Sequence, residues 1–105
     1  MILDEDLNRR CEEIAKHYGS LNQLIQLSEE CGELITSALH YRRAEADGYI
    51  DEDTRHALKE EIVDVLIMIN QMINIGIITE DEIYGIARAK IKRQERRISD
   101  GRNYR

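Results

Sequence analysis

The sequence predicts an all-α fold, a four-helix bundle-type subunit in one domain that spans residues 1–105. Three observations favour this fold class. The chain has no proline and only six glycines, and aromatic residues make up 5% of it, whereas β proteins need more turn residues and more aromatic strands. Its apolar residues recur at the three- and four-residue spacing of helices. Two segments carry the Ser/Thr-x-x-Gln/Glu pattern of an N-terminal capping box.

The first two expected helices meet at Gly19. The first runs from about residue 4 to residue 18, and glycine is a common residue just beyond the end of a helix. The segment Ser20-Leu-Asn-Gln23 reads as a capping box and opens a long helix over about residues 21–45. The first helix carries an apolar stripe formed by Leu7, Cys11, Ile14 and Ala15.

A polar connection around Asp47-Gly48 leads to the third and fourth expected helices. The third covers about residues 53–75. Thr79-Glu-Asp-Glu82 is the second capping box and begins a fourth helix that reaches about Ser99. Residues 100–105 are expected to form a flexible tail.

The third helix is apolar nearly all round, which requires burial on every side. Three partner helices of a small chain do not provide that, but a second subunit does. We therefore expect a homo-oligomer, a homodimer or a dimer of dimers, with this helix buried at its centre. Its apolar residues are Ile62, Val63, Val65, Leu66, Ile67, Met68, Ile69, Met72, Ile73 and Ile75.

Charge is distributed unevenly along the chain. Residues 1–87 carry 7 basic and 19 acidic side chains, and residues 88–105 carry 8 basic and 2 acidic ones. This predicts an acidic body and a basic last helix. Nucleic acid is a less favoured partner, because an acidic body repels phosphate backbones.

The cysteines and the hydrophobic segments indicate an intracellular, non-membrane protein. Cys11 and Cys31 lack the spacing of a zinc site or a redox motif, and we expect reduced thiols. The first residues lack a signal-type apolar region, and no uncharged apolar stretch approaches the length of a membrane span. We expect a cytoplasmic location and no membrane partner.

Two pairs of acids interrupt the apolar pattern of the second and third helices. Glu30 and Glu33 are three residues apart, as are Glu61 and Asp64, so each pair shares a helix face. If these consecutive helices pack antiparallel, the pairs face each other. Four converging carboxylates repel and lose hydration, and a hard divalent cation such as Mg²⁺ relieves both effects. The alternative is that each pair is an ordinary solvated helix surface.

The segments "EECGE" and "EIVD", separated by 27 residues, match an EExxE–spacer–ExxD pattern. In this the chain resembles the MazG-like all-α nucleoside triphosphate pyrophosphohydrolases over about residues 20–97. The resemblance implies cleavage of a nucleoside triphosphate to the monophosphate and pyrophosphate, as nucleotide-pool house-cleaning. It also implies Mg²⁺, with Mn²⁺ as a substitute, bound by Glu30, Glu33, Glu61 and Asp64. Glu29 is an additional candidate, either as a further metal ligand or for orienting water, and the candidate catalytic residues are Glu29, Glu30 and Glu61.

Candidate phosphate-binding residues lie on the fourth helix. Lys90, Arg93 and Arg97 share one face, and members of the family that the chain resembles have a Lys/Arg-rich stretch at this place. Cations there would hold the phosphates and neutralise the leaving pyrophosphate. Alternatively, these residues only pair with the acidic body.

The base-binding candidates are Asn22, His40 and Tyr41, with Tyr18 also available. Some proteins similar to this one stack the base on Trp or Phe, and this chain has neither. Packing is the alternative role of these side chains. Asn70, a polar residue within the apolar third helix, is assigned to the subunit interface.

Two other functional classes were considered. A di-iron bundle needs repeated Glu-x-x-His pairs on core helices, and the chain has only Asp53-x-x-His56. A non-catalytic helical oligomer, regulatory or scaffolding, would use its basic C-terminal helix to contact nucleic acid. Mg²⁺ should stabilise the enzyme but not the non-catalytic oligomer, so this measurement distinguishes the two.

Overall fold

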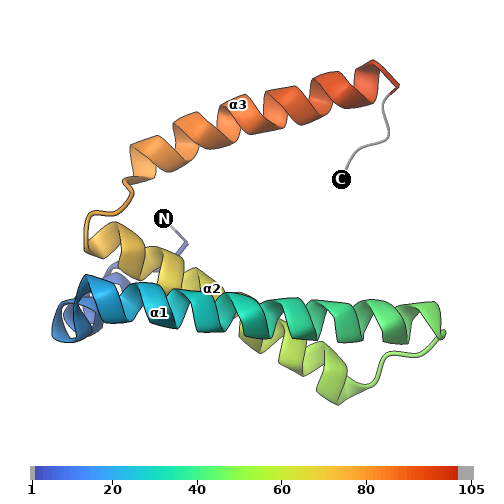
Figure 1. Ribbon diagram of the computed structural model, residues 1–105, viewed down its shortest axis with the longest axis horizontal. Coiled ribbons are helices and arrows are strands. Elements are labelled where there is room, and N and C mark those ends of the chain that lie inside the picture. The colour runs from blue at the N-terminus through green and yellow to red at the C-terminus, as the bar shows by residue number, and fades with distance from the viewer. Residues whose placement is uncertain (1, 102–105) are drawn as a thin grey trace.

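The computed structural model describes residues 2–101, and over this range the chain is all-helical, without strands. The three helices are α1, Glu5–Ala46; α2, Glu52–Asn74; and α3, Glu80–Ser99. Figure 1 shows α1 and α2 as an antiparallel hairpin whose helices cross, and α3 leaving that hairpin at the end of α2. The all-α prediction is confirmed.

Side chains at the N-terminus of each helix satisfy backbone donors that have no partner within the helix. Asp4 accepts a hydrogen bond from the Leu7 amide at 2.8 Å, and Asp51 accepts one from the Thr54 amide at 2.7 Å. Thr79 begins α3 with both hydrogen bonds of the predicted capping box present. These residues explain why α2 and α3 begin within one or two residues of the predicted positions.

The boundary predicted at Gly19 is present as a kink, where two helical segments meet at one non-helical residue. Gly19 has φ +83° and ψ 162°, while the residues on both sides continue as one element, α1. Only glycine adopts this backbone region without steric cost. Because a single residue makes the bend, no loop separates the two segments, and they form one element, so residues 2–101 contain three helices where four were expected.

Residues 2–101 do not form the predicted four-helix bundle. Helices α1 and α2 pack extensively against each other, whereas α3 packs along neither of them. Large apolar side chains of α3 are exposed, among them Ile86, Ile91 and Ile98. The hairpin alone therefore forms the body of the described chain.

The core of this hairpin is small and partly polar. Its buried apolar residues are Cys11, Ala15, Met68 and Met72, and its buried polar residues are Gln23, Asn70 and Gln71. The expected burial of the apolar third helix is only partial in one chain, because Ile62 and Val63 of α2 are 43% and 49% exposed.

Asn70 makes its hydrogen bonds within the chain. Its amide Nδ2 donates to Asn8 Oδ1 at 2.9 Å and to Asn74 Oδ1 at 3.0 Å, and Asn74 also donates to Asn8. This network ties the start of α1 to the end of α2. It gives Asn70 hydrogen-bond partners within the chain, and the interface role expected for this residue stays a prediction.

Both cysteines are free thiols, as expected.

Asp100 caps the end of α3 with its amide donating to the Arg96 carbonyl at 2.9 Å. The rest of the expected flexible tail, residues 102–105, lies outside the described residues. No helix in residues 2–101 is long and apolar enough to cross a membrane.

Candidate metal centre

The hairpin brings the two predicted acid pairs together. Glu30 and Glu33 lie on the second half of α1, and Glu61 and Asp64 lie on the facing part of α2. Each of the four offers one carboxylate oxygen, and these oxygens all lie within 4.8 Å of one another. We call these four residues the acid cluster. Three members are half-buried, and Glu33 is exposed.

The pKa values in the acid cluster reflect crowding and burial. Burial raises the pKa of Glu30 above its ordinary value, and the neighbouring Glu33 and Asp64 carboxylates raise it further. The Gln26 amide partly offsets this shift by donating a hydrogen bond to Glu30 at 2.8 Å. The pKa of Glu61 is also raised, first by burial and then by the charges of Glu33, Asp64 and Glu30. Both shifts mean that burial and mutual repulsion make the ionised forms of Glu30 and Glu61 less stable.

Two oxygens of the acid cluster have unused hydrogen-bonding capacity. The Oε2 atoms of Glu30 and Glu61 are buried and have no hydrogen-bond partner among the described residues. A buried acceptor without a partner is costly, and a buried carboxylate without a cation is costlier. The donor set consists of carboxylate oxygens alone, the ligands that Mg²⁺, Mn²⁺ and Ca²⁺ prefer. The residues present therefore fit a hard divalent cation.

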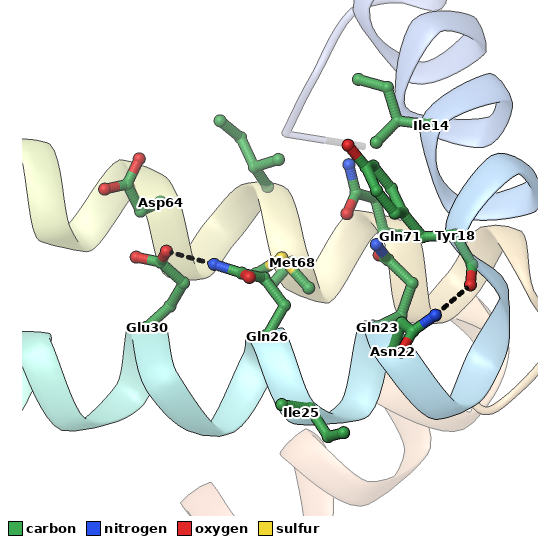
Figure 2. Close-up of a pocket in the computed structure, with 11 residues that line it drawn as sticks. Ile14, Tyr18, Asn22, Gln23, Ile25, Gln26, Glu30, Asp64, Met68 and Gln71 are labelled. Atoms are coloured by element: carbon green, nitrogen blue, oxygen red, sulfur yellow. Dashed lines mark hydrogen bonds between the residues drawn. The ribbon is translucent and has the colours of Figure 1, made fainter.

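A cavity of about 480 Å³ opens on one side of the acid cluster, where Glu30 and Asp64 form part of its wall. Figure 2 shows that it extends along the hairpin from these acids to the kinked part of α1. We call it the amide cavity because neutral polar side chains and apolar ones form the rest of its wall. The polar ones are Tyr18, Asn22, Gln23, Gln26 and Gln71; the apolar ones are Ile14, Ile25, Ile67 and Met68.

A second, more open cavity of about 520 Å³ lies against the other two members of the acid cluster, Glu33 and Glu61. We call it the acidic cavity. Its remaining lining residues are Glu29, Gly32, Thr36 and Ser37. The acid cluster thus stands between a partly apolar cavity and a carboxylate- and hydroxyl-lined one.

The base-binding candidates are dispersed. Asn22 lines the amide cavity, although its side chain is already engaged, because Nδ2 donates to the Tyr18 carbonyl at 2.9 Å. His40 lines a different cavity, near the start of α2. Tyr41 is half-buried and belongs to the wall of neither the amide nor the acidic cavity. Of the three, only Asn22 lies at the cavity beside the acids.

The phosphate-binding candidates Lys90, Arg93 and Arg97 lie on α3. Because α3 packs along neither α1 nor α2, one chain does not bring them to the acid cluster. The phosphate-binding role of these three residues therefore stays a prediction that a single described chain does not test.

Sequence reasoning missed two buried residues of the amide cavity, Gln23 and Gln71. Both are 3% exposed. A signal was present, because each lies four residues from a residue of an apolar helix stripe, Gln23 from Leu27 and Gln71 from Ile67. A glutamine at such a position is a polar side chain where the pattern calls for an apolar one.

Comparisons with protein-family models, with curated proteins and with solved structures give no match to this chain.

Proposed function

We propose that the protein is a Mg²⁺-dependent nucleoside triphosphate pyrophosphohydrolase that removes unwanted nucleotides from the cytoplasmic pool. The observation that carries this proposal is the meeting of four carboxylates from two helices within 4.8 Å of one another. Two further features support it: the EExxE and ExxD segments that resemble the MazG-like enzymes, and the adjoining cavities on both sides of the acids.

Glu30, Glu33, Glu61 and Asp64 would hold the metal. Once bound there, Mg²⁺ would neutralise the phosphate charge and make a coordinated water more acidic. The buried, unpartnered Oε2 atoms of Glu30 and Glu61 supply a reason for the cation, because it would satisfy both. Mn²⁺ has the same preference for oxygen ligands and is expected to substitute.

The reaction needs a base for the attacking water. The water forms a bond to the α-phosphorus, the bond from this phosphorus to the bridging oxygen breaks, and pyrophosphate leaves. A carboxylate takes the proton that the water loses. Glu29 and Glu61 both line the acidic cavity and are the candidates for this base. Glu30 lies on the opposite side, in the wall of the amide cavity.

Phosphates that approach the acid cluster also need positive side chains. Lys90, Arg93 and Arg97 are the candidates, and a second copy of the chain is the means to bring them there. The α3 helix has exposed apolar side chains, the α2 helix exposes Ile62 and Val63 beside the acids, and their charges are complementary. Burying these surfaces together would give the homodimer, or dimer of dimers, that the composition of α2 favours.

The test is pyrophosphate release from a panel of ribo- and deoxynucleoside triphosphates with Mg²⁺, using wild-type protein and Glu61→Gln. We expect the monophosphate and pyrophosphate as products and loss of both in the variant.

The separation of α3 from the hairpin also favours a second candidate, a scaffold whose basic helix contacts nucleic acid. Salt-sensitive binding to DNA or RNA, with no hydrolysis of any nucleotide, would support the scaffold and overturn the enzyme.

A further inference from the structure

We infer that the amide cavity is the nucleoside site, where Gln23 hydrogen-bonds the edge of the base and Tyr18 covers its face. This inference rests on the proposed function and adds the orientation of the bound substrate to it. The nucleoside would lie on the Glu30 and Asp64 side of the acid cluster, and the β- and γ-phosphates on the Glu33 and Glu61 side.

The kink at Gly19 shapes this cavity. Ile14 and Tyr18 precede the kink, Asn22 and Gln26 follow it, and all four line the same cavity. The bend therefore changes the course of α1 at the cavity and lets both segments contribute to its wall (Figure 2). Its volume of about 480 Å³ is within the range of sites for small organic ligands.

Gln23 supplies an unused hydrogen-bonding group at the wall of the cavity. Its side chain is 3% exposed, and its Oε1 atom is buried with no hydrogen-bond partner among the described residues. A buried acceptor without a partner destabilises the folded protein, and a ligand that donates a hydrogen bond to it would remove that cost. The terminal torsion of glutamine is broad, and a small rotation would present the carboxamide to a base. A carboxamide offers a donor and an acceptor side by side, matching the paired donor and acceptor on a nucleobase edge.

Gln71 supports the opposite wall of the cavity. It lies on α2, is 3% exposed, and hydrogen-bonds the buried Cys11 thiol, whose pKa is raised by burial and lowered in part by this contact. The contact positions the Gln71 carboxamide. Two neutral amides from facing helices suit a flat, uncharged, polar-edged ligand better than they suit a phosphate.

Tyr18 supplies an aromatic surface at the cavity. Its side chain is 56% exposed, and its ring meets that of His17 edge-on at 4.8 Å between centroids. Asn22 donates to the Tyr18 carbonyl and so braces the backbone at this point. Stacking on an aromatic side chain strengthens the binding of any base, because every base has a flat π face. Tyr18 therefore takes the place of the Trp and Phe that the chain lacks.

The difference between the two cavities sets the direction of the substrate. The amide cavity combines apolar side chains with neutral amides, which suits a base and sugar. The acidic cavity is open and lined by carboxylates, hydroxyls and Gly32. None of its lining residues is a large apolar or aromatic side chain on which a base could stack, but it admits water and metal-neutralised phosphates. The phosphate that is attacked would then lie at the acid cluster, between the two cavities.

The test compares binding of two probes in the presence of Mg²⁺. One is the set of α,β-imido analogues of the four deoxynucleoside triphosphates, which resist cleavage, and the other is tripolyphosphate, which has no base. We expect wild-type protein to bind at least one analogue about tenfold or more tightly than tripolyphosphate. Gln23→Met should lower the affinity for that analogue about tenfold and leave the affinity for tripolyphosphate unchanged.

The melting temperature distinguishes recognition from a structural role of Gln23. Methionine has a similar shape and removes the unpaired acceptor, so Gln23→Met should melt at or above the wild-type temperature without ligand. A structural glutamine would give a lower melting temperature instead. The control is Gln94→Met, a change of the same kind at an exposed residue of α3.

Tyr18→Ala provides a second test that does not depend on a buried substitution. It should weaken analogue binding about tenfold and leave tripolyphosphate unaffected, whereas Tyr49→Ala, at an exposed tyrosine outside the cavity, should change neither. If the analogues and tripolyphosphate bind alike in every variant, the nucleoside site is wrong and the metal centre stands. If neither probe binds to wild-type protein, the proposed function itself fails.

Discussion

Glu30 of α1 and Asp64 of α2 lie side by side across the contact between the two helices, at the wall of the amide cavity (Figure 2). They are 34 residues apart in sequence, and only the antiparallel hairpin brings them together. Burial raises the pKa of Glu30, and the charges of Glu33 and Asp64 raise it further. The metal-free protein carries this repulsion at neutral pH, and the first two predictions measure it.

Mg²⁺ should stabilise the folded protein through the acid cluster. A ligand that binds only the folded state at ten times its Kd adds about 1.4 kcal/mol to the free energy of unfolding. For a domain of this size that raises the melting temperature by roughly 5–10 °C. The measurement is thermal melting with EDTA and with increasing Mg²⁺. Glu61→Gln should lose most of the rise, because it removes one charged ligand.

Glu60→Gln is the matched control for this titration. Glu60 is the neighbour of Glu61 on α2, but it is exposed, lies outside the acid cluster and pairs with His56. Its replacement should leave the Mg²⁺-induced rise intact. A wild-type melting temperature that Mg²⁺ does not move would mean that the four acids are a surface cluster without a cation.

Metal-free protein should lose stability as the pH rises above the ordinary pKa of glutamate, about 4.3. The pKa values of Glu30 and Glu61 are raised in the folded state, so the folded state binds more protons than the unfolded state above about pH 4.3, the ordinary glutamate pKa. The free energy of unfolding therefore falls through this window until both folded-state pKa values are passed. Denaturant titration in EDTA at several pH values measures the slope.

Glu61→Gln should flatten this pH dependence, and it should make the metal-free protein more stable than wild type at pH 7.5. Asp51 does not interfere, because the Thr54 amide lowers its pKa and its contribution changes only below about pH 4. Equal slopes for wild type and Glu61→Gln would show that the repulsion lies elsewhere. Addition of Mg²⁺ should reverse the wild-type loss, since metal binding favours the deprotonated acids.

Gly19→Ala should destabilise the protein and impair the amide cavity without weakening Mg²⁺ binding. The φ of +83° with ψ 162° is strained for any residue with a Cβ, at a cost of about 1–3 kcal/mol. Steric clash is not the cause, because an added Cβ would meet no atom within 4 Å. If α1 straightens to relieve the strain, Tyr18 moves away from Gln23. Melting temperature, nucleotide affinity and Mg²⁺ affinity report the three effects separately.

The control for this substitution is Gly85→Ala in α3, where the backbone is helical and a Cβ also meets nothing within 4 Å. Alanine is the better helix former there by about 1 kcal/mol, so this variant should not be less stable than wild type. A Gly19→Ala protein that keeps both wild-type stability and nucleotide affinity would show that the kink is dispensable.

The helices and the acid cluster were predictable because their signals are local. Thr79 and Glu82 mark the start of α3 through a capping box that depends on four consecutive residues, and the structure has it. The spacing of Glu30 and Glu33, repeated by Glu61 and Asp64, was enough to foresee that four carboxylates would meet once two consecutive helices paired. The side chains within each pair are related by the helix repeat alone.

The kink, the buried glutamines and the place of α3 were not predictable in this way. They depend on the positions of whole helices, which local patterns do not determine. A glycine that ends a helix and one that kinks it look alike in sequence, so Gly19 was placed between two helices. The burial of Gln23 and Gln71 follows from how α1 and α2 cross, and not from their own segments. Similarly, the face shared by Lys90 and Arg93 does not indicate where α3 lies relative to the acids.

The last prediction concerns α3 and a second copy of the chain. If α3 packs on a partner subunit, sedimentation should show a dimer or larger assembly, and Ile91→Lys should dissociate it. Ile91 is 54% exposed in the single chain, so a monomer would tolerate this charge. Ala89 is also exposed and lies two residues away, nearly on the opposite face of the helix. Ala89→Lys should therefore leave the assembly intact.

Mixing two inactive variants would then show whether the basic residues act on the partner's acids. Glu61→Gln removes a ligand from the acid cluster, and Arg93→Ala removes a cation from α3. In a mixed dimer that shares its sites across subunits, one site has both residues intact, so an equal mixture should recover up to about a quarter of the wild-type rate. If Arg93 serves the acids of its own chain, every site in the mixture lacks one residue. The mixture would then be as inactive as its components, and the assembly would have a structural role alone.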